Sequence, residues 1–149
     1  MIVLKVEPGK APVQTEIGNG LSGLQAAVNG YIEAIYPFED PVAVICNEDG
    51  KNLGMEPNRA LYDADGQLYD IICGPFVMVG LTEEDFGDLL PHYMDKYTEH
   101  FKDPERFYLN SEGRIRVVKV IDPDAICWRI APEDRKRENP QRTRGGEAR

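Results

Sequence analysis

The first 17 residues combine aliphatic and β-branched positions with one strong turn signal. Residues 1–6 are apolar at most positions, and a Pro-Gly pair follows them. Val13, Thr15 and Ile17 then recur at every second position, which is the period of a strand with one buried face. This pattern predicts that the chain opens with a β-hairpin.

The spacing of apolar residues changes to a helical period over residues 20–28. Leu21, Leu24 and Val28 recur at intervals of three and four and predict the buried face of this helix. Asn19 can cap its beginning. The Asn-Gly pair after the last turn can end it, with the glycine in the left-handed conformation.

Four further runs predict strands, at residues 31–36, 42–46, 68–73 and 76–79. The second run is apolar throughout, which is typical of a central strand that is buried on both faces. An Asp-Gly pair just before the third run indicates a hairpin turn. Pro57 disfavours helical backbone at the residue before it, so we expect residues 56–59 to be extended or turned.

A helix is predicted to begin in the stretch Thr82–Asp85. This stretch resembles a capping box, with aspartate where glutamate is usual. The helix would carry Phe86, Leu89 and Leu90 on its apolar face.

A second helix is predicted to begin at Pro91, because proline is favoured at the first helical position. Tyr93, Tyr97 and Phe101 recur at every fourth residue. We therefore expect these three aromatic side chains to face the core.

The last predicted elements are a second hairpin and a polar tail. Residues 107–109 and 114–121 read as strands around a Ser-Glu-Gly turn, and the apolar phase shifts at Val118, as it does at a β-bulge. We expect a single α+β domain over residues 1–132, with a mostly antiparallel sheet and helices packed on one face. The stretch 133–149 is almost purely polar and predicts a basic, disordered tail.

Charge is unevenly distributed along the chain, whose net charge is −9. Residues 1–127 contain 10 basic and 22 acidic residues, a balance of −12, whereas residues 128–149 contain 7 and 4, a balance of +3. An acidic body repels phosphate backbones, so we expect no direct nucleic-acid binding by the body. It can attract a partner with a basic surface.

The composition also bears on location. No apolar run approaches the roughly 18 residues that a membrane span needs, and the N-terminus is too short and too polar for a signal peptide. The three cysteines are far apart and form no C-x-x-C pair, which favours buried thiols in a reducing cytoplasm.

No motif of known chemistry is complete in the sequence. Gly50-Lys51 lacks the earlier glycine and the following Ser or Thr of a phosphate-binding loop. His92 and His100 are too far apart for two ligands of one metal on a helix, and no cysteine lies near them. No serine lies in G-x-S-x-G. We therefore predict no catalytic residue, no metal site and no cofactor, and a protein that is not an enzyme.

The most distinctive polar feature surrounds Arg59, the only Lys or Arg among residues 52–95, a span with nine acidic residues. One interpretation pairs Arg59 with a carboxylate that holds a loop to the domain. The other makes it an anchor for a ligand or partner, with Asn47, Glu48 and Asn58 as neighbouring polar groups.

Glu83, Glu84, Asp85 and Asp88 form the densest acidic cluster on one predicted element. A solvated helix beginning is one interpretation, because the helix dipole favours acids there. The other is a contact surface for a basic partner, in which long-range attraction speeds association.

Four short motifs occur in order along the chain, at residues 30–33 (GYIE), 47–51 (NEDGK), 57–59 (PNR) and 74–76 (GPF). Together they resemble the domain-of-unknown-function family numbered 3846. In that family one residue separates the proline from Asn-Arg, whereas here they are adjacent. The resemblance covers about residues 1–104 and does not extend over the C-terminal part.

The resemblance implies small proteins carried by phages, plasmids and integrated elements of bacteria, and it implies no established catalytic residues. Accessory proteins of mobile elements often counter host defence by binding an effector, which is an analogy of genetic context. The expected function is therefore non-catalytic inhibition of a host nuclease or defence protein through an acidic surface. The alternative is a module that sequesters a small ligand or nucleotide with Asn47, Asn58 and Arg59. A third possibility is an enzyme whose site is assembled from distant residues, and the oligomeric state is left open.

Overall fold

The computed structural model describes residues 1–121. The chain divides into two units, Met1–Lys119 and Val120–Arg149, and the fold described below is that of the first unit. The expected tail and the expected domain boundary at residue 132 lie outside the described residues and stay predictions. Within residues 1–121, neither helix has the length and apolar character needed to cross a membrane.

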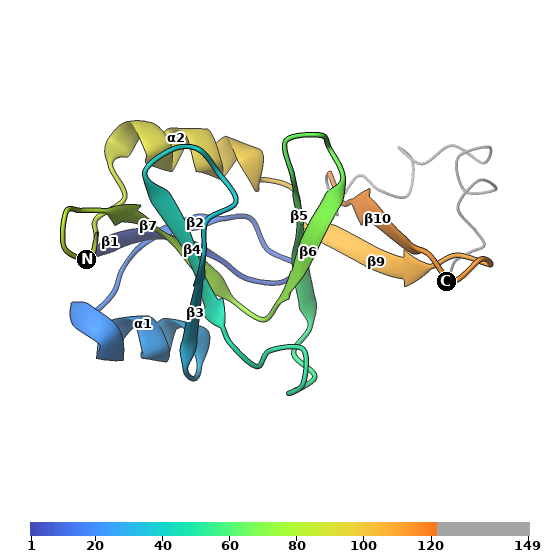
Figure 1. Ribbon diagram of the computed structural model, residues 1–149, viewed down its shortest axis with the longest axis horizontal. Coiled ribbons are helices and arrows are strands. Elements are labelled where there is room, and N and C mark those ends of the chain that lie inside the picture. Colours follow the sequence, from blue (N-terminus) through green and yellow to red (C-terminus); the bar gives the residue numbers. More distant parts are fainter. Residues whose placement is uncertain (122–149) are drawn as a thin grey trace. The chain divides into compact units, whose positions relative to one another are not determined.

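The first unit contains more β-structure than helix (Figure 1). Its elements in chain order are β1 (Ile2–Val6), β2 (Val13–Glu16), α1 (Gly20–Val28), β3 (Ile32–Ile35), β4 (Val42–Asn47), β5 (Pro57–Tyr62), β6 (Leu68–Cys73), β7 (Phe76–Leu81), β8 (Phe86–Gly87), α2 (Pro91–His100), β9 (Glu105–Leu109) and β10 (Ile115–Lys119). The expected α+β class is confirmed, as are the opening and C-terminal hairpins.

The main sheet has the strand order β2-β1-β7-β4-β3, with β8 paired to β7, and every pairing in it is antiparallel. All six residues of β4 are buried, and so are five of the six in β7. β4 is therefore a central strand buried on both faces, as predicted, and β7, which the sequence predicts only as a strand, is buried in the same way. Hairpins β5–β6 and β9–β10 form separate two-stranded sheets.

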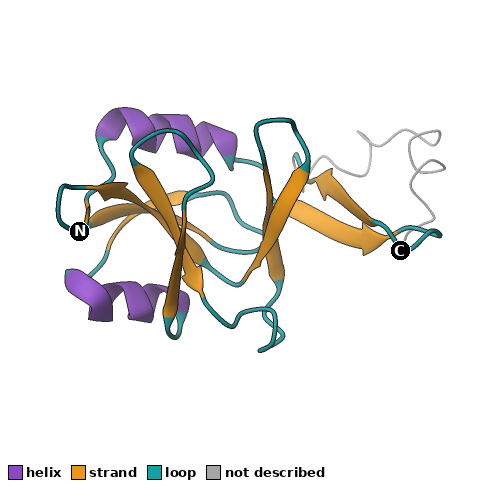
Figure 2. Ribbon diagram, viewed as in Figure 1, coloured by secondary structure: helices purple, strands orange, loops and turns teal. Residues whose placement is uncertain are grey.

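Both faces of the main sheet are covered. Val44 and the residues two positions before and after it on β4 pack in one core cluster with Tyr97 of α2. Ile45, on the other face of β4, packs in a second cluster with Leu24 of α1. Figure 2 shows the two helices on opposite sides of the sheet. The expectation that the helices share one face is therefore wrong. A sheet whose central strands are apolar at nearly every position must have both faces covered.

Helix α1 has the predicted bounds but not the predicted details. Leu21 is 57% exposed, and the buried stripe begins at Leu24. Asn29, not the following glycine, adopts the left-handed conformation at the end of the helix, with φ of 63°. The side chain of Asn19 makes no cap and accepts a hydrogen bond from the N-terminal amino group at 3.0 Å.

The helix predicted from Thr82 is absent, and a turn between β7 and β8 stands in its place. The Thr82 Oγ1 donates to the Asp85 carbonyl at 2.7 Å and accepts from the Asp85 N–H at 3.0 Å. Gly80 and Gly87 are partners across the resulting hairpin. Threonine and aspartate satisfy backbone groups equally well in turns and at helix caps, so the motif alone could not separate the two.

Helix α2 and the last hairpin follow the sequence more closely. Tyr97 and Phe101 are buried and Tyr93 packs against the core, as predicted. The register of β9 and β10 is continuous, so the bulge predicted at Val118 is wrong. Val117 and Val118 are both half-buried, because a two-stranded hairpin does not require all its apolar side chains on one face.

Asp40, in the link between β3 and β4, connects this link to α2. Its Oδ2 accepts a hydrogen bond from Tyr97 Oη at 2.6 Å and pairs with Lys96 Nζ at 2.5 Å. The bonds from Lys96 and Tyr97 hold the pKa of Asp40 below its ordinary value. Burial and the neighbouring Asp40 carboxylate raise the pKa of Tyr97.

The fold predicts that Gly23→Ala destabilises the protein. A Cβ at this position would lie 1.9 Å from the carbonyl oxygen of Gly18. Alanine normally gains about 1 kcal/mol over glycine in a helix, but this contact should reverse the sign and cost about 1–3 kcal/mol. Denaturant unfolding measures the effect. Ser22→Ala, at the exposed neighbouring position, is the control and should be neutral or slightly stabilising; an equal gain from both changes would contradict the close approach.

Asp40 should make stability depend on pH in the acid range. Because its folded pKa is lowered, the carboxylate stabilises the fold above its ordinary pKa of about 3.9, and this contribution is lost as the pH falls through the folded pKa. Asp40→Asn should therefore lower the thermal midpoint at neutral pH and reduce the further fall in acid. The control is Asp95→Asn at an exposed position of α2, and an acid dependence unaltered by Asp40→Asn would refute the assignment.

Candidate functional site

The residues singled out from the sequence lie in three places. Asn58 and Arg59 lie in β5, in the interior. Asn47 and Glu48 lie where β4 ends. The acidic cluster lies in and after the β7–β8 turn. The structure therefore does not gather Asn47, Asn58 and Arg59 into one polar cluster, because the first contacts α1 and the other two contact β1, α2 and the loops between strands.

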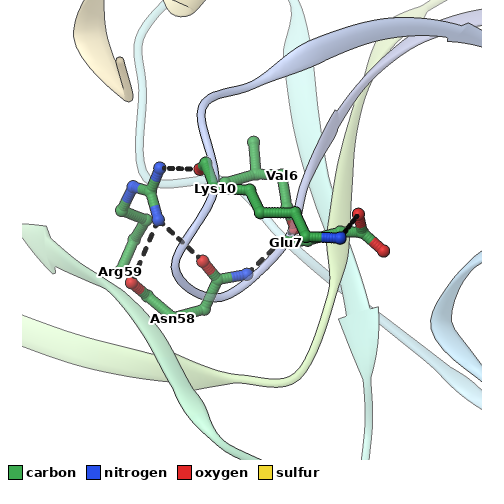
Figure 3. Close-up of polar contacts among 5 residues, drawn as sticks. All are labelled: Val6, Glu7, Lys10, Asn58 and Arg59. Carbon is green, nitrogen blue, oxygen red and sulfur yellow. Dashed lines mark hydrogen bonds and ion pairs between the residues drawn. The ribbon is translucent and has the colours of Figure 1, made fainter. Parts of the chain in front are cut away.

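Arg59 is fully buried and uses every N–H of its guanidinium within the fold. Its Nε donates to the Phe101 carbonyl at 3.2 Å. Its Nη1 donates to the carbonyl and to the Oδ1 of Asn58, at 3.3 and 2.9 Å. Its Nη2 donates to the carbonyls of Lys10 and Phe101, at 2.7 and 2.8 Å. Figure 3 shows the guanidinium between Lys10 and Asn58.

Asn58 is also fully buried and completes the network. Its Nδ2 donates to the carbonyls of Val6 and Gly74, both at 2.9 Å, while its Oδ1 accepts from Arg59. Figure 3 includes the bond to Val6. The network joins β5 to the end of β1, to the β1–β2 and β6–β7 links, and to the end of α2.

The charge of Arg59 is stabilised by carbonyl oxygens, which corrects the prediction of a paired carboxylate. Within residues 1–121 its guanidinium has no carboxylate at ion-pair distance. Phe101 follows the last residue of α2, where the helix dipole is negative and favours a cation. Burial lowers the pKa of Arg59, and the charges of Glu105 and Asp103 oppose this effect.

Glu105 contributes from β9. Its Oε1 accepts a hydrogen bond from the Ala60 N–H at 2.8 Å, so the carboxylate that lies near Arg59 binds the backbone of β5 instead. Burial raises the pKa of Glu105, and the bond from Ala60 and the charge of Arg59 lower it. All five N–H groups of the Arg59 guanidinium donate within the fold, so none is left for a ligand in this conformation.

Asn47 joins the end of α1 to the loop after β4. Its Nδ2 donates to the carbonyls of Val28 and Asn29, at 3.1 and 3.2 Å, and its Oδ1 accepts from the Asp49 N–H at 2.8 Å. A Cβ on Gly30 would lie 2.6 Å from this Nδ2. Asn47 is therefore occupied within the fold, whereas its neighbour Glu48 is exposed.

A cleft of about 280 Å³ lies beside this loop. Its lining comes from β3, β4, the loop after β4, and β6, and consists of Glu33, Cys46, Asn47, Glu48, Asp49, Gly50, Lys51, Asn52, Asp70, Ile71, Ile72 and Cys73. Four of these residues are acidic and one is basic. Lys51 Nζ pairs with Asp70 Oδ1 at 2.5 Å, and Asn52 Nδ2 donates to Asp49 Oδ1 at 2.8 Å. The cleft therefore presents an excess of negative charge.

Cys46 and Cys73 also line the cleft, although nothing in their sequence positions predicts that they lie together. Burial raises the pKa of the Cys46 thiol to about 12, and the negative charge of Glu33 contributes to the same increase. Burial also raises the pKa of Cys73. Both thiols are protonated at neutral pH, whereas a nucleophilic cysteine needs a lowered pKa. Within residues 1–121, no three His, Cys, Asp or Glu side chains are placed to hold a metal ion.

The four acids near β8 divide into two kinds. Asp85 and Asp88 have structural contacts, since Asp85 Oδ1 accepts from the Phe86 N–H at 2.7 Å and Asp88 Oδ1 from the Ile2 N–H at 2.8 Å. Glu83 and Glu84 are exposed in the turn. Glu83, Glu84 and Asp85 therefore lie in the β7–β8 turn and Asp88 just after β8, rather than at the beginning of a helix, and their role in binding stays a prediction.

Comparison with known proteins gives one match. A protein-family model described as "Domain of unknown function (DUF3846)" matches residues 1–102. No curated protein and no solved structure matches the chain. The matched range includes Asn47, Asn58, Arg59 and the acidic cluster, and it ends just after α2.

Arg59→Lys should destabilise the fold strongly. Lysine brings three donors in place of five and cannot reach the same set of carbonyls, which would leave buried acceptors unpaired. We expect a loss of about 2–4 kcal/mol in the free energy of unfolding, measured by denaturant titration. The control is Arg106→Lys at an exposed position of β9, expected within about 0.5 kcal/mol of the wild type. Equal effects of the two changes would show that the network does not stabilise the fold.

Proposed function

The chain belongs to this family, whose description assigns no activity, and we propose that it is a non-catalytic binding protein of a bacterial mobile genetic element. In this proposal it acts in the cytoplasm and inhibits a host nuclease or another defence protein. It recognises a basic surface of that protein through its own acidic surface. Its body does not bind nucleic acid directly.

The distribution of charge carries the proposal. Residues 1–95 contain 16 acidic and four basic residues. One of the four, Arg59, is buried, and two others are paired, Lys10 with Glu7 and Lys51 with Asp70. The main sheet and the β5–β6 hairpin therefore present a surface with almost no free positive charge. Such a surface attracts a basic groove over a Debye length of about 8–10 Å at physiological salt.

The cleft provides the concave part of this surface. Its carboxylates belong to β3, β6 and the loop after β4, so elements far apart in the sequence bring them together. A concave acidic surface focuses the field on a cationic side chain better than a flat one. Nuclease grooves that bind phosphates are basic and would be complementary to it.

The alternative, a module that sequesters a small ligand with Asn47, Asn58 and Arg59, has no supporting contact. The hydrogen-bonding groups of Asn58 and Arg59 are occupied within the fold. A ligand would have to displace these bonds. This alternative stays an untested prediction.

The test begins with capture of the partner from a bacterial lysate at low salt, followed by association kinetics with the purified partner. We compare two variants that each remove two negative charges, Glu33→Gln/Glu48→Gln at the cleft and Glu83→Gln/Glu84→Gln at the β7–β8 turn. The cleft variant should slow association several-fold at low salt, and high salt should abolish the difference because it screens the charges.

The β7–β8 variant is the control for overall charge. A larger effect of this variant would move the contact to that turn, as the sequence alone suggested. Association that neither variant slows at low salt would contradict an acidic contact surface. Turnover of a substrate by the purified chain would contradict the non-catalytic proposal.

A further inference from the structure

The strand β3 is one end of the main sheet and pairs only with β4 among the described residues. The Glu48 N–H donates to the Tyr31 carbonyl at 3.0 Å, so these two residues form a hydrogen-bonded pair. In an antiparallel ladder such pairs alternate with non-hydrogen-bonded pairs. From the register, Glu33 and Ile35 direct their backbone groups toward β4, whereas Ile32 and Ala34 direct theirs to the outer edge.

This four-residue edge is short and carries one charge, Glu33, but it has no lysine, proline or β-bulge to prevent pairing with another strand. Natural edge strands carry lysine, proline or a bulge that prevents such pairing. β3 has the sequence Ile-Glu-Ala-Ile, and its register with β4 has no shift. None of its four residues is buried, although every residue of the neighbouring β4 is.

Exposed tyrosines lie at both ends of this edge. Tyr31 is 73% exposed and Tyr36 57% exposed, one just before β3 and the other just after it. Tyrosine is enriched in protein interfaces because it buries a large apolar ring and keeps a polar tip. Its ring face also attracts lysine and arginine side chains. The two rings are therefore placed to cover the ends of an added strand.

The charge beside the outer edge of β3 determines which side chains an added strand should carry. Glu33 is the exposed charged residue of β3 and also lines the cleft with Glu48, Asp49 and Asp70. Lys51 is already paired with Asp70. Cationic side chains on the Glu33 face of an added strand would thus meet unbalanced carboxylates, as opposite charges do in cross-strand pairs.

A second copy of this chain fits the edge poorly. Antiparallel self-pairing of β3 would bring the two Glu33 carboxylates close together, and each chain has a net charge of −9. We propose that the outer edge of β3 binds an extended, lysine- or arginine-rich segment of the partner protein as an additional β-strand. This inference deepens the proposed function and rests on it, because it names the part of the partner that the acidic surface recognises.

Amide hydrogen exchange of the full wild-type chain tests the geometry directly. The probe is a synthetic peptide of alternating lysine and threonine, and a peptide of alternating glutamate and threonine is its control. The lysine peptide should bind and slow exchange at Ile32 and Ala34, the two outward amides of β3. Gln14 and Glu16 are the outward amides of β2 at the opposite edge, because the Ile17 N–H donates to the Met1 carbonyl; their exchange should not change.

A matched pair of proline substitutions tests the same point by mutation. Ala34→Pro removes an outward donor from β3, and Gln14→Pro makes the corresponding change at β2. Ala34→Pro should weaken binding of the lysine peptide about tenfold or more, as expected for a lost hydrogen bond and a blocked edge. Gln14→Pro should leave the affinity unchanged. Unfolding midpoints identify any variant that does not fold, and the exchange experiment on the wild type is independent of both.

Several results would overturn the inference. Binding of the lysine peptide without protection at Ile32 and Ala34 would place the contact elsewhere, and so would equal affinity for the glutamate peptide. If the chain dimerises and Ala34→Pro abolishes the dimer, the outer edge of β3 binds a second copy of the chain instead of a partner strand. A captured partner that associates in a salt-dependent way but protects neither amide would refute the β3 inference and leave the proposed function standing. Partner association that is insensitive to salt and to the charge variants would instead refute the proposed function.

Discussion

The buried guanidinium of Arg59 sets the arrangement of the elements around the cleft. A charged group without contact to water needs an acceptor for each N–H, because each unpaired group costs free energy comparable to a lost hydrogen bond. The acceptors come from the β1–β2 link, from Asn58 and from the residue that follows α2. Asn58 adds bonds to the last residue of β1 and to the β6–β7 link. The β5–β6 hairpin, which provides one wall of the cleft, is thereby held beside the main sheet.

The elements that could be predicted from the sequence are those whose structure and burial follow from the pattern of their own residues. β4 and β7 are apolar at nearly every position, and only the centre of a sheet buries such a strand on both faces. Tyr97 and Phe101 have a helical spacing that only a core-facing stripe explains. The position of each helix could not be predicted in this way, because an amphipathic helix carries no information about which face of the sheet it covers.

The remaining features depend on contacts between distant segments. Thr82 and Asp85 have the chemistry of a helix cap, but the pairing of Gly80 with Gly87 makes them a hairpin turn. Acidic residues surround Arg59 in the sequence and predict a carboxylate partner. Its partners are instead mainly backbone carbonyl oxygens. Every residue has such a carbonyl, so the sequence alone could not identify which ones bind Arg59. The cleft combines residues from β3, β4 and β6. The sequence shows the acidic residues of the cleft. It does not show that they lie close together, or that Cys46 and Cys73 lie beside them.

An acidic surface and an open sheet edge have complementary roles in recognition. Charge acts over distance and speeds encounter, whereas backbone hydrogen bonds act at contact and fix register. In this protein the two lie together, since Glu33 belongs both to the edge strand and to the acidic cleft. The most direct test of this account is an experimentally determined structure of the chain with its captured partner. The account predicts a partner strand hydrogen-bonded to the backbone of Ile32 and Ala34, with lysine or arginine side chains at the cleft. A partner bound elsewhere, with the outer edge of β3 unpaired, would contradict it.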